Sequence, residues 1–284
     1  SDYVTLLKNR FAEIQTVSVY GGEEADPPQF GRVFVAVDVN NAQGASETSK
    51  VAFANYLKER STLSIEPIVV SAEFMNLYVE TTVYYNIAKG TLSTGNVREQ
   101  TINAIVDYSD TYLNEFGKTF RYSNFVRAID DSDSNIVSNE TMIKAIIEIT
   151  PDTTPRNFIV NFKNELDYDY LNSSDIASYK PAILSSSFSY NGDTCYIQDN
   201  GSGIIQIVKA SSNATAYEFI DKSAGTVDYA TGRLILSNFF VDNDLGNNIK
   251  FYAKVKSQDI VSPKERIVSV RGEDIKIKVL GIKV

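Results

Sequence analysis

The run Arg32-Val33-Phe34-Val35-Ala36-Val37-Asp38-Val39 shows the clearest alternation of side chains in the chain. Successive side chains of a β-strand point to opposite faces of a sheet, so the four valines share one face. The pattern therefore predicts a strand that places its valine face on a hydrophobic core.

The residues around this strand predict a small α+β unit over residues 1–73. Apolar spacing and capping signals predict, in chain order, a helix over 3–14, a strand over 16–20, the valine strand, a helix over 47–57 capped by Ser46, and a strand over 68–72. This α-β-β-α-β order is typical of an open-faced sandwich, in which helices cover one face of a sheet.

Residues 74–152 predict a second open-faced α+β unit with the order β-α-α-β. The predicted elements are a strand over 77–85, a long helix over 96–116, a short helix over 123–129 and a strand over 143–149. Asn96 with Glu99 resembles a capping box at the start of the long helix, and Gly117 is well placed to end it.

Residues 153–284 predict an all-β domain, because short apolar runs alternate with turn signals. Asn200-Gly201-Ser202-Gly203 and Thr231-Gly232 are typical of hairpin turns. Pro151 and Pro155 bracket the boundary before this domain, and the segment between them is a candidate hinge. The predicted fold class is thus α+β, with two small open-faced sandwich units followed by an all-β sandwich or partial barrel.

The composition removes several classes of chemistry. The 284 residues include no His and a single Cys, Cys195, and the formal net charge is −9. Histidine triads, histidine bases, an intrachain disulfide and a multi-cysteine zinc site are thereby excluded. An acidic chain is repelled by phosphate backbones, and no run approaches the ~18–20 apolar residues that cross a bilayer. We expect no catalytic residue, no cofactor, no metal, and neither nucleic acid nor a membrane as a partner.

Two acidic pairs remain as candidate sites for chemistry. Asp242-x-Asp244-x-Gly246 begins like a calcium loop, but its glycine comes one place early and Ala253 stands at the closing position, which favours a solvated turn. Asp167 and Asp169 could serve as the paired carboxylates of a glycosidase. The alternative function is therefore a carbohydrate-active or carbohydrate-binding β-domain protein.

Glycines and the cysteine have structural interpretations. Neither Gly21-Gly22 nor Gly201-x-Gly203 fits a phosphate-binding motif, and both are predicted to be sharp turns that need positive φ. The predicted structural turn positions are Gly21, Gly22, Gly225 and Gly232. Cys195 lies in an apolar run and is predicted to be a small core residue.

Phe239 and Phe240 form a candidate interface. Adjacent residues on a strand point to opposite faces, so one ring can enter the core while a partner covers the other. The equal alternative is that one ring packs under a loop.

Three stretches, taken in order and spacing, resemble a known family. They are Val17-Ser18-Val19-Tyr20-Gly21-Gly22-Glu23 followed by Gly31-Arg32-Val33-Phe34-Val35, Phe120-Arg121-x-Ser123 after the long helix, and Gly225-Thr226-Val227-Asp228-Tyr229 with Thr231-Gly232-Arg233. The first two, the second together with Ile129-Asp130, resemble baseplate J-like proteins of contractile tails. The third resembles the C-terminal part of the T-even-type baseplate wedge subunit.

The resemblance implies a structural component of the phage tail baseplate, located in the virion. Such proteins pair with copies of themselves, as a homodimer or in ring contacts, and with other baseplate wedge proteins around the tail hub, and they carry no catalytic residues. Arg121, Ser123 and Tyr229, with the four glycines above, would be structural positions. The chain begins without Met, so we expect a piece of a longer wedge protein. A receptor-binding adhesin is a third interpretation.

Overall fold

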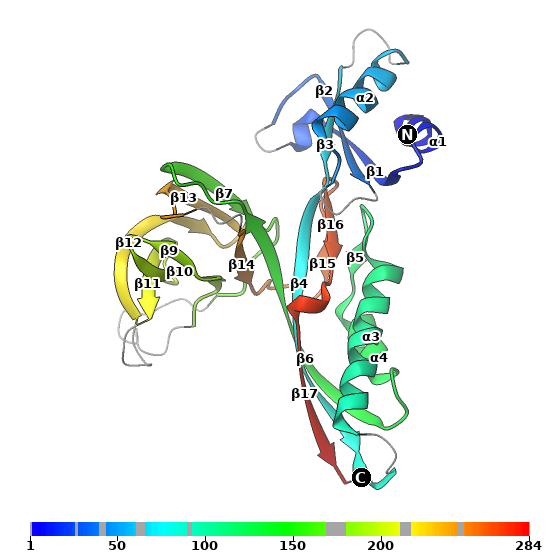
Figure 1. The fold of residues 1–284 in the computed structure, drawn as a ribbon, viewed down its shortest axis with the longest axis vertical. Helices are drawn as coiled ribbons and strands as arrows, with labels where there is room; N and C mark the ends of the chain where they lie inside the picture. Colours follow the sequence, from blue (N-terminus) through cyan, green and yellow to red (C-terminus); the bar gives the residue numbers. More distant parts are fainter. Residues whose placement is uncertain are drawn as a thin grey trace. The chain divides into compact units, whose positions relative to one another are not determined.

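The computed structural model describes residues 2–25, 28–39, 44–60, 66–89, 93–168, 180–210, 217–243 and 247–283. The chain divides into two compact units that are discontinuous in sequence (Figure 1). Unit 1 consists of Ser1–Phe74, Ser109–Phe120 and Val261–Ser269, and unit 2 consists of Met75–Tyr108, Arg121–Ile260 and Val270–Val284.

Unit 1 is built on a three-stranded sheet and two helices in the predicted α-β-β-α-β order. The elements are α1 (Asp2–Arg10), β1 (Ile14–Gly21), the short helix η1 (Gly22–Glu24), β2 (Arg32–Val39), α2 (Glu47–Lys58) and β3 (Glu66–Ser71), with β5 (Thr119–Phe120) and β16 (Arg266–Ser269) from the later segments. β2 is the central strand, antiparallel to β1 and parallel to β3. Ile14 opens β1 instead of ending the first helix.

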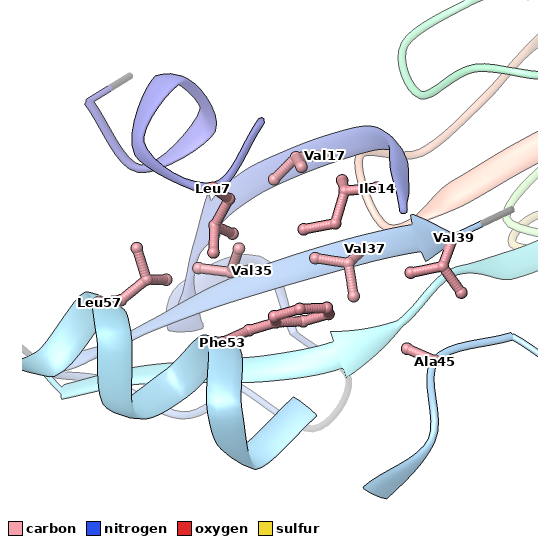
Figure 2. Close-up of a cluster of buried hydrophobic side chains, with 9 residues drawn as sticks. All are labelled: Leu7, Ile14, Val17, Val35, Val37, Val39, Ala45, Phe53 and Leu57. Atoms are coloured by element: carbon pink, nitrogen blue, oxygen red, sulfur yellow. The ribbon is translucent and has the colours of Figure 1, made fainter. Parts of the chain in front are cut away.

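The valine face of β2 forms the main core of unit 1, as predicted. Val35, Val37 and Val39 are buried against helix side chains that include Leu7 and Phe53 (Figure 2). Ser46 caps α2 as predicted, because its side chain accepts a hydrogen bond of 3.1 Å from the Ser49 N–H.

The opposite face of β2 is also buried, which the alternation did not predict. Phe34 and Ala36 form a second cluster with Tyr20, whose ring stacks on Phe34 at 5.5 Å between centroids. Phe116 packs on this cluster, although the sequence analysis assigned it to the second domain. The sheet therefore has two covered faces, because a segment distant in sequence supplies the second cover.

Unit 2 contains most of the β-structure. Its elements are β4 (Glu73–Asn86), which starts in unit 1, η2 (Ile87–Lys89), α3 (Thr94–Tyr112), which ends in unit 1, α4 (Tyr122–Asp130), β6 (Ile136–Ile149), β7 (Arg156–Asn161), β8 (Ile183–Ser185), β9 (Phe188–Tyr190), β10 (Asp193–Asp199), β11 (Ile204–Ala210), β12 (Tyr217–Asp228), β13 (Arg233–Phe239), β14 (Ile249–Ala253), β15 (Ile260–Val261, shared with unit 1), η4 (Gly272–Asp274) and β17 (Ile275–Ile282).

A continuous sheet joins the regions that were predicted as separate domains. Its strands follow the order β4-β6-β14-β8-β10-β11-β12-β13-β7, and β17 pairs with β4. The boundary expected at residues 152 and 153 therefore lies inside unit 2, because β14 pairs with β6 through Ile147 and Phe251. The fold class is α+β with open sheets and a mostly β region, consistent with the predicted open-faced units and β-sandwich (Figure 1).

The ends of α3 differ from the prediction. The Ser93 hydroxyl, and not Asn96, caps the helix, accepting a hydrogen bond of 3.2 Å from the Asn96 N–H. The helix ends at Tyr112, and Asn114 takes the left-handed conformation with φ of 56° before Gly117 does so with φ of 73°. Serine and asparagine are about equally good N-caps, so the residue types did not decide between Ser93 and Asn96. Asn tolerates positive φ, so the helix can end before Gly117.

Candidate assembly surfaces

Large apolar side chains are exposed in both units. In unit 1 they are Phe30, Val51, Phe74, Tyr112 and Val261, and in unit 2 they are Ile87, Val137, Ile159, Tyr168, Ile204 and Phe219. Single exposed apolar residues are ordinary, so the informative ones are those held on a rigid backbone. Within the described ranges, no helix is long and apolar enough to span a membrane.

Phe30 is an exposed side chain whose neighbouring backbone is fixed. Its side chain is 81% exposed, and the preceding Gln29 N–H donates a hydrogen bond of 2.7 Å to the Gly22 carbonyl. A Cβ on Gly22 would lie 1.7 Å from the Gln29 carbonyl oxygen, so only glycine permits this contact. Gly31 follows with φ of 78°. The sequence analysis missed Phe30, although a Phe-Gly pair after Pro27-Pro28 was a usable turn signal.

The four glycines predicted at turns meet different structural requirements. Gly21 has φ of −74°, so positive φ is not the reason there, and at Gly22 the reason is the close approach of Gln29. Gly225 is not at a turn: it lies inside β12, where a Cβ would meet the Ile235 carbonyl oxygen at 2.1 Å. Gly232 does lie at the turn between β12 and β13, with φ of 69°.

The pair Phe239 and Phe240 is largely enclosed within unit 2. Phe239 is 2% exposed and contacts the rings of Phe158 and Phe188, so it is the ring of the pair that lies in the core. Phe240 is half-buried, and its ring centroid lies 5.0 Å from that of Tyr190. Coverage of the rest of the Phe240 ring by a partner stays a prediction.

The calcium-like and cysteine positions serve the local fold. Both oxygens of the Asp242 carboxylate accept hydrogen bonds from the turn between β9 and β10, with the Ser189 hydroxyl and the Asn191 and Gly192 N–H groups as donors. These bonds, led by the Gly192 N–H, lower the pKa of Asp242. Asp244 lies outside the described residues. Cys195 is fully buried, as predicted, and burial raises the pKa of its thiol.

A buried carboxyl group organises the β region of unit 2. Asp199 is fully buried and accepts hydrogen bonds from the Tyr229 hydroxyl at 2.7 Å, the Ile183 N–H at 2.8 Å and the Gly201 N–H at 3.1 Å. The Tyr229 ring in turn stacks on Tyr168 at 3.9 Å between centroids. Asp199 thereby connects β8, the turn after β10 and the end of β12, and it fixes the ring on which Tyr168 lies.

Tyr168 lines a groove in unit 2 with a volume of about 420 Å³. Its other lining residues are Met142, Lys144, Asp167, Lys180, Pro181, Ala182, Leu184, Tyr252 and Lys254, and we call it the lysine groove. Asp167, one of the two predicted glycosidase carboxylates, pairs with Lys254 at 2.5 Å. The other, Asp169, lies outside the described residues. The sequence analysis missed the three lysines because they are far apart in the chain.

An ion-pair network holds the segment that leads into β17. Asp274 is buried and accepts hydrogen bonds from Lys250 Nζ at 2.8 Å and from Arg271 Nε at 2.9 Å. Arg271 also pairs with Glu148 of β6. Burial opposes the charge on Lys250, but the hydrogen bonds that Lys250 donates to Asp274 and Glu273 outweigh it and raise the pKa of Lys250. The network therefore ties η4 to β6 and β14.

Asp259 completes the N-terminus of α4. Arg121, the residue before α4, provides no side-chain cap, and the Asp259 carboxylate accepts from Arg121 Nη1 at 2.7 Å and from the Tyr122 N–H at 3.0 Å. A carboxylate at a helix N-terminus is favoured by the exposed N–H groups and the helix dipole. Ser123, in the same turn, is exposed.

We expect the Asp259 contact to be lost in acid. The hydrogen bond from Arg121 and then that from the Tyr122 N–H hold the pKa of Asp259 below its usual value. The contact therefore stabilises the fold above about pH 4, the ordinary pKa range of Asp, and is lost as the pH falls through the lower folded pKa. Asp259→Asn should reduce the free energy of unfolding at about pH 7 and have little effect at about pH 2.

The matched control for this experiment is Asp131→Asn, which removes an exposed carboxylate from the other end of α4, 3.7 Å from Arg127 Nε. Chemical denaturation of all three proteins at both pH values measures the effect. A pH dependence of Asp259→Asn no larger than that of Asp131→Asn would contradict the assignment.

Comparison with known families gives these surfaces a context. The family model of the baseplate structural protein gp6, C-terminal domain I, matches residues 1–70, and that of C-terminal domain III of the same protein matches residues 73–148. Together the two matches cover just over half of the chain and correspond to its two predicted α+β units. They define the class as structural proteins of the phage tail baseplate.

The chain belongs to the gp6 family of baseplate structural proteins and corresponds to part of the C-terminal region. The baseplate wedge protein gp6 of Enterobacteria phage T4 is 23% identical over 150 residues, which cover 52% of this chain and 22% of that protein. The chain thus spans about a fifth of the length of this curated relative. Family membership places it in the tail baseplate of the virion, in a structural role.

Proposed function

We propose that this chain is a non-enzymatic docking component of the baseplate wedge. It associates with a second copy of itself and with neighbouring wedge proteins, and these contacts build the ring around the tail hub. Family membership supports the structural part of this proposal. The exposed apolar side chains of the two units, above all Phe30, support the proposed contacts with copies and neighbours.

The observation that carries the proposal is the rigid presentation of Phe30. Aromatic side chains are enriched where protein interfaces are most strongly stabilised, and a ring on a fixed backbone loses little conformational entropy on binding. The bond between Gln29 and Gly22 fixes the backbone beside Phe30, while the ring itself is 81% exposed. Such a ring can insert into a partner surface without first being ordered.

We expect the chain to form a dimer or larger species at micromolar concentration, and Phe30→Ala to weaken that association. Loss of one well-packed aromatic anchor typically costs about 2 kcal/mol or more of binding free energy, which raises the dissociation constant about thirtyfold. Sedimentation equilibrium measures both. The melting temperature should not fall, because the ring makes little contact with its own chain.

Phe219→Ala is the matched control, because this exposed ring on β12 has Lys222 Nζ 5.7 Å from its centroid, within its own strand. It should leave the dissociation constant unchanged. A monomer at micromolar concentration in the unmodified protein would contradict self-association. Equal effects of the two substitutions would contradict the role of Phe30.

A further inference from the structure

The lysine groove concentrates positive charge in an acidic chain. Lys144 of β6, Lys180 and Lys254 of β14 line it, against a single carboxylate, Asp167. Asp167 is paired with Lys254 at 2.5 Å. Among the described residues, no carboxylate pairs with Lys144 or Lys180. Counted over its described lining residues, the groove has an excess of two positive charges, while the chain carries −9.

The walls of the groove are fixed by backbone bonds. The segment Glu165–Asp167 runs antiparallel to Lys254–Lys256, with a bridge between Leu166 and Val255. The Asp167 N–H donates to the Lys254 carbonyl at 2.8 Å, and the Lys256 N–H donates to the Glu165 carbonyl at 2.8 Å. The groove is thus preorganised, which lowers the entropy cost of binding.

The aromatic rings give the groove apolar area as well as charge. One ring face of Tyr168 stacks on Tyr229, which Asp199 holds, and Tyr168 remains 40% exposed. Among the other lining residues, Tyr252 of β14 lies opposite Leu184 of β8 in the strand register. A bound peptide with acidic side chains would place its carboxylates near the lysines and the aliphatic parts of those side chains against the tyrosine rings.

We propose that the lysine groove binds an acidic peptide segment of a neighbouring baseplate protein, whose carboxylates pair with Lys144 and Lys180. The inference rests on the proposed docking function and assigns it a surface and a partner chemistry. Complementary charge steers association and sets specificity, and it makes the affinity depend on salt.

Zero-length carbodiimide crosslinking of intact baseplates tests this contact, because it joins a lysine amine only to a carboxylate that touches it. Mass spectrometry should find Lys144 or Lys180 joined to an Asp or Glu of a neighbouring protein. Crosslinks from other lysines of this chain to neighbours, with none from Lys144 or Lys180, would overturn the groove assignment alone. A complete lack of crosslinks between this chain and any neighbour would overturn the docking function too.

The double variant Lys144→Glu with Lys180→Glu supplies the second readout. Its dissociation constant for the synthetic peptide found by crosslinking should rise about tenfold or more, and the unmodified protein should lose affinity as salt increases. The matched control is Lys222→Glu with Lys278→Glu, which makes the same charge change at exposed positions of unit 2. Unchanged melting temperatures show that the variants fold.

An equal loss of affinity in the two double variants would overturn the proposal, since net charge alone would then explain it. Binding of a labelled DNA oligonucleotide that the Lys144 and Lys180 changes abolish, without any effect on the peptide, would also overturn it in favour of a nucleic-acid site.

Discussion

Phe53→Ala is expected to destabilise unit 1 by about 3–5 kcal/mol, as deletion of a buried aromatic ring typically does. Phe53 is 1% exposed and lies at the centre of the cluster that joins α1, α2 and the valine face of β2 (Figure 2). Its ring also contacts Phe11, with 4.6 Å between centroids. Removal of the ring would therefore leave a cavity and abolish packing contacts with α1, α2 and β2 together.

Hydrogen exchange measures this effect without assuming a single unfolding transition. The amides of β1, β2 and β3 should exchange faster in the variant, while those of unit 2 serve as an internal reference. Val51→Ala is the matched control on the same helix, because Val51 is 58% exposed and Ala is the better helix former. Similar exchange in the two variants would contradict the assigned core.

Asp199→Ala is expected to destabilise the β region of unit 2 by about 3 kcal/mol or more. The substitution removes the acceptor for the Tyr229 hydroxyl and for the Ile183 and Gly201 N–H groups. Each buried donor left without its acceptor costs about 1–3 kcal/mol. Tyr229→Phe removes the bond to Asp199 and the longer bond of 3.4 Å that the hydroxyl accepts from the Gly203 N–H, and it should cost about 1 kcal/mol.

Chemical denaturation followed by far-ultraviolet circular dichroism measures these losses. Asp193→Ala is the control on the same strand, because Asp193 is half-exposed and forms a surface ion pair with Lys209 at 3.1 Å. Its effect should be much smaller than that of Asp199→Ala. The role assigned to Asp199 is wrong if the two effects are equal.

The parts of the fold that were predicted depend on local patterns. The alternation of β2, the Ser46 cap and the hairpin glycines each act within a few residues, so the sequence shows them directly. The second face of the unit 1 sheet was missed because Phe116 is distant in sequence. The pairing of β6 with β14 across residues 152 and 153 was not predicted for the same reason, since it is long-range.

The candidate surfaces were less predictable than the fold. Adjacent strand positions predicted that one ring of the pair Phe239 and Phe240 enters the core, but only the rings from β7 and β9 show that this ring is Phe239. Asp242 resembled a metal ligand in sequence, whereas the structure directs its oxygens to a turn formed about fifty residues earlier. Lys144, Lys180 and Lys254 meet only after the sheet has formed, and no local motif marks them.

The pairing of β17 with β4 has a consequence for synthesis of the protein. The two strands are parallel, with Ile275 opposite Val79, so they join early and late parts of the chain. While the ribosome synthesises the residues between β4 and β17, the edge of β4 that later pairs with β17 does not yet have this partner. Exposed strand edges favour wrong pairing, and contacts of long sequence separation form slowly. We therefore expect nascent chains to be most prone to aggregation before β17 has emerged from the ribosome.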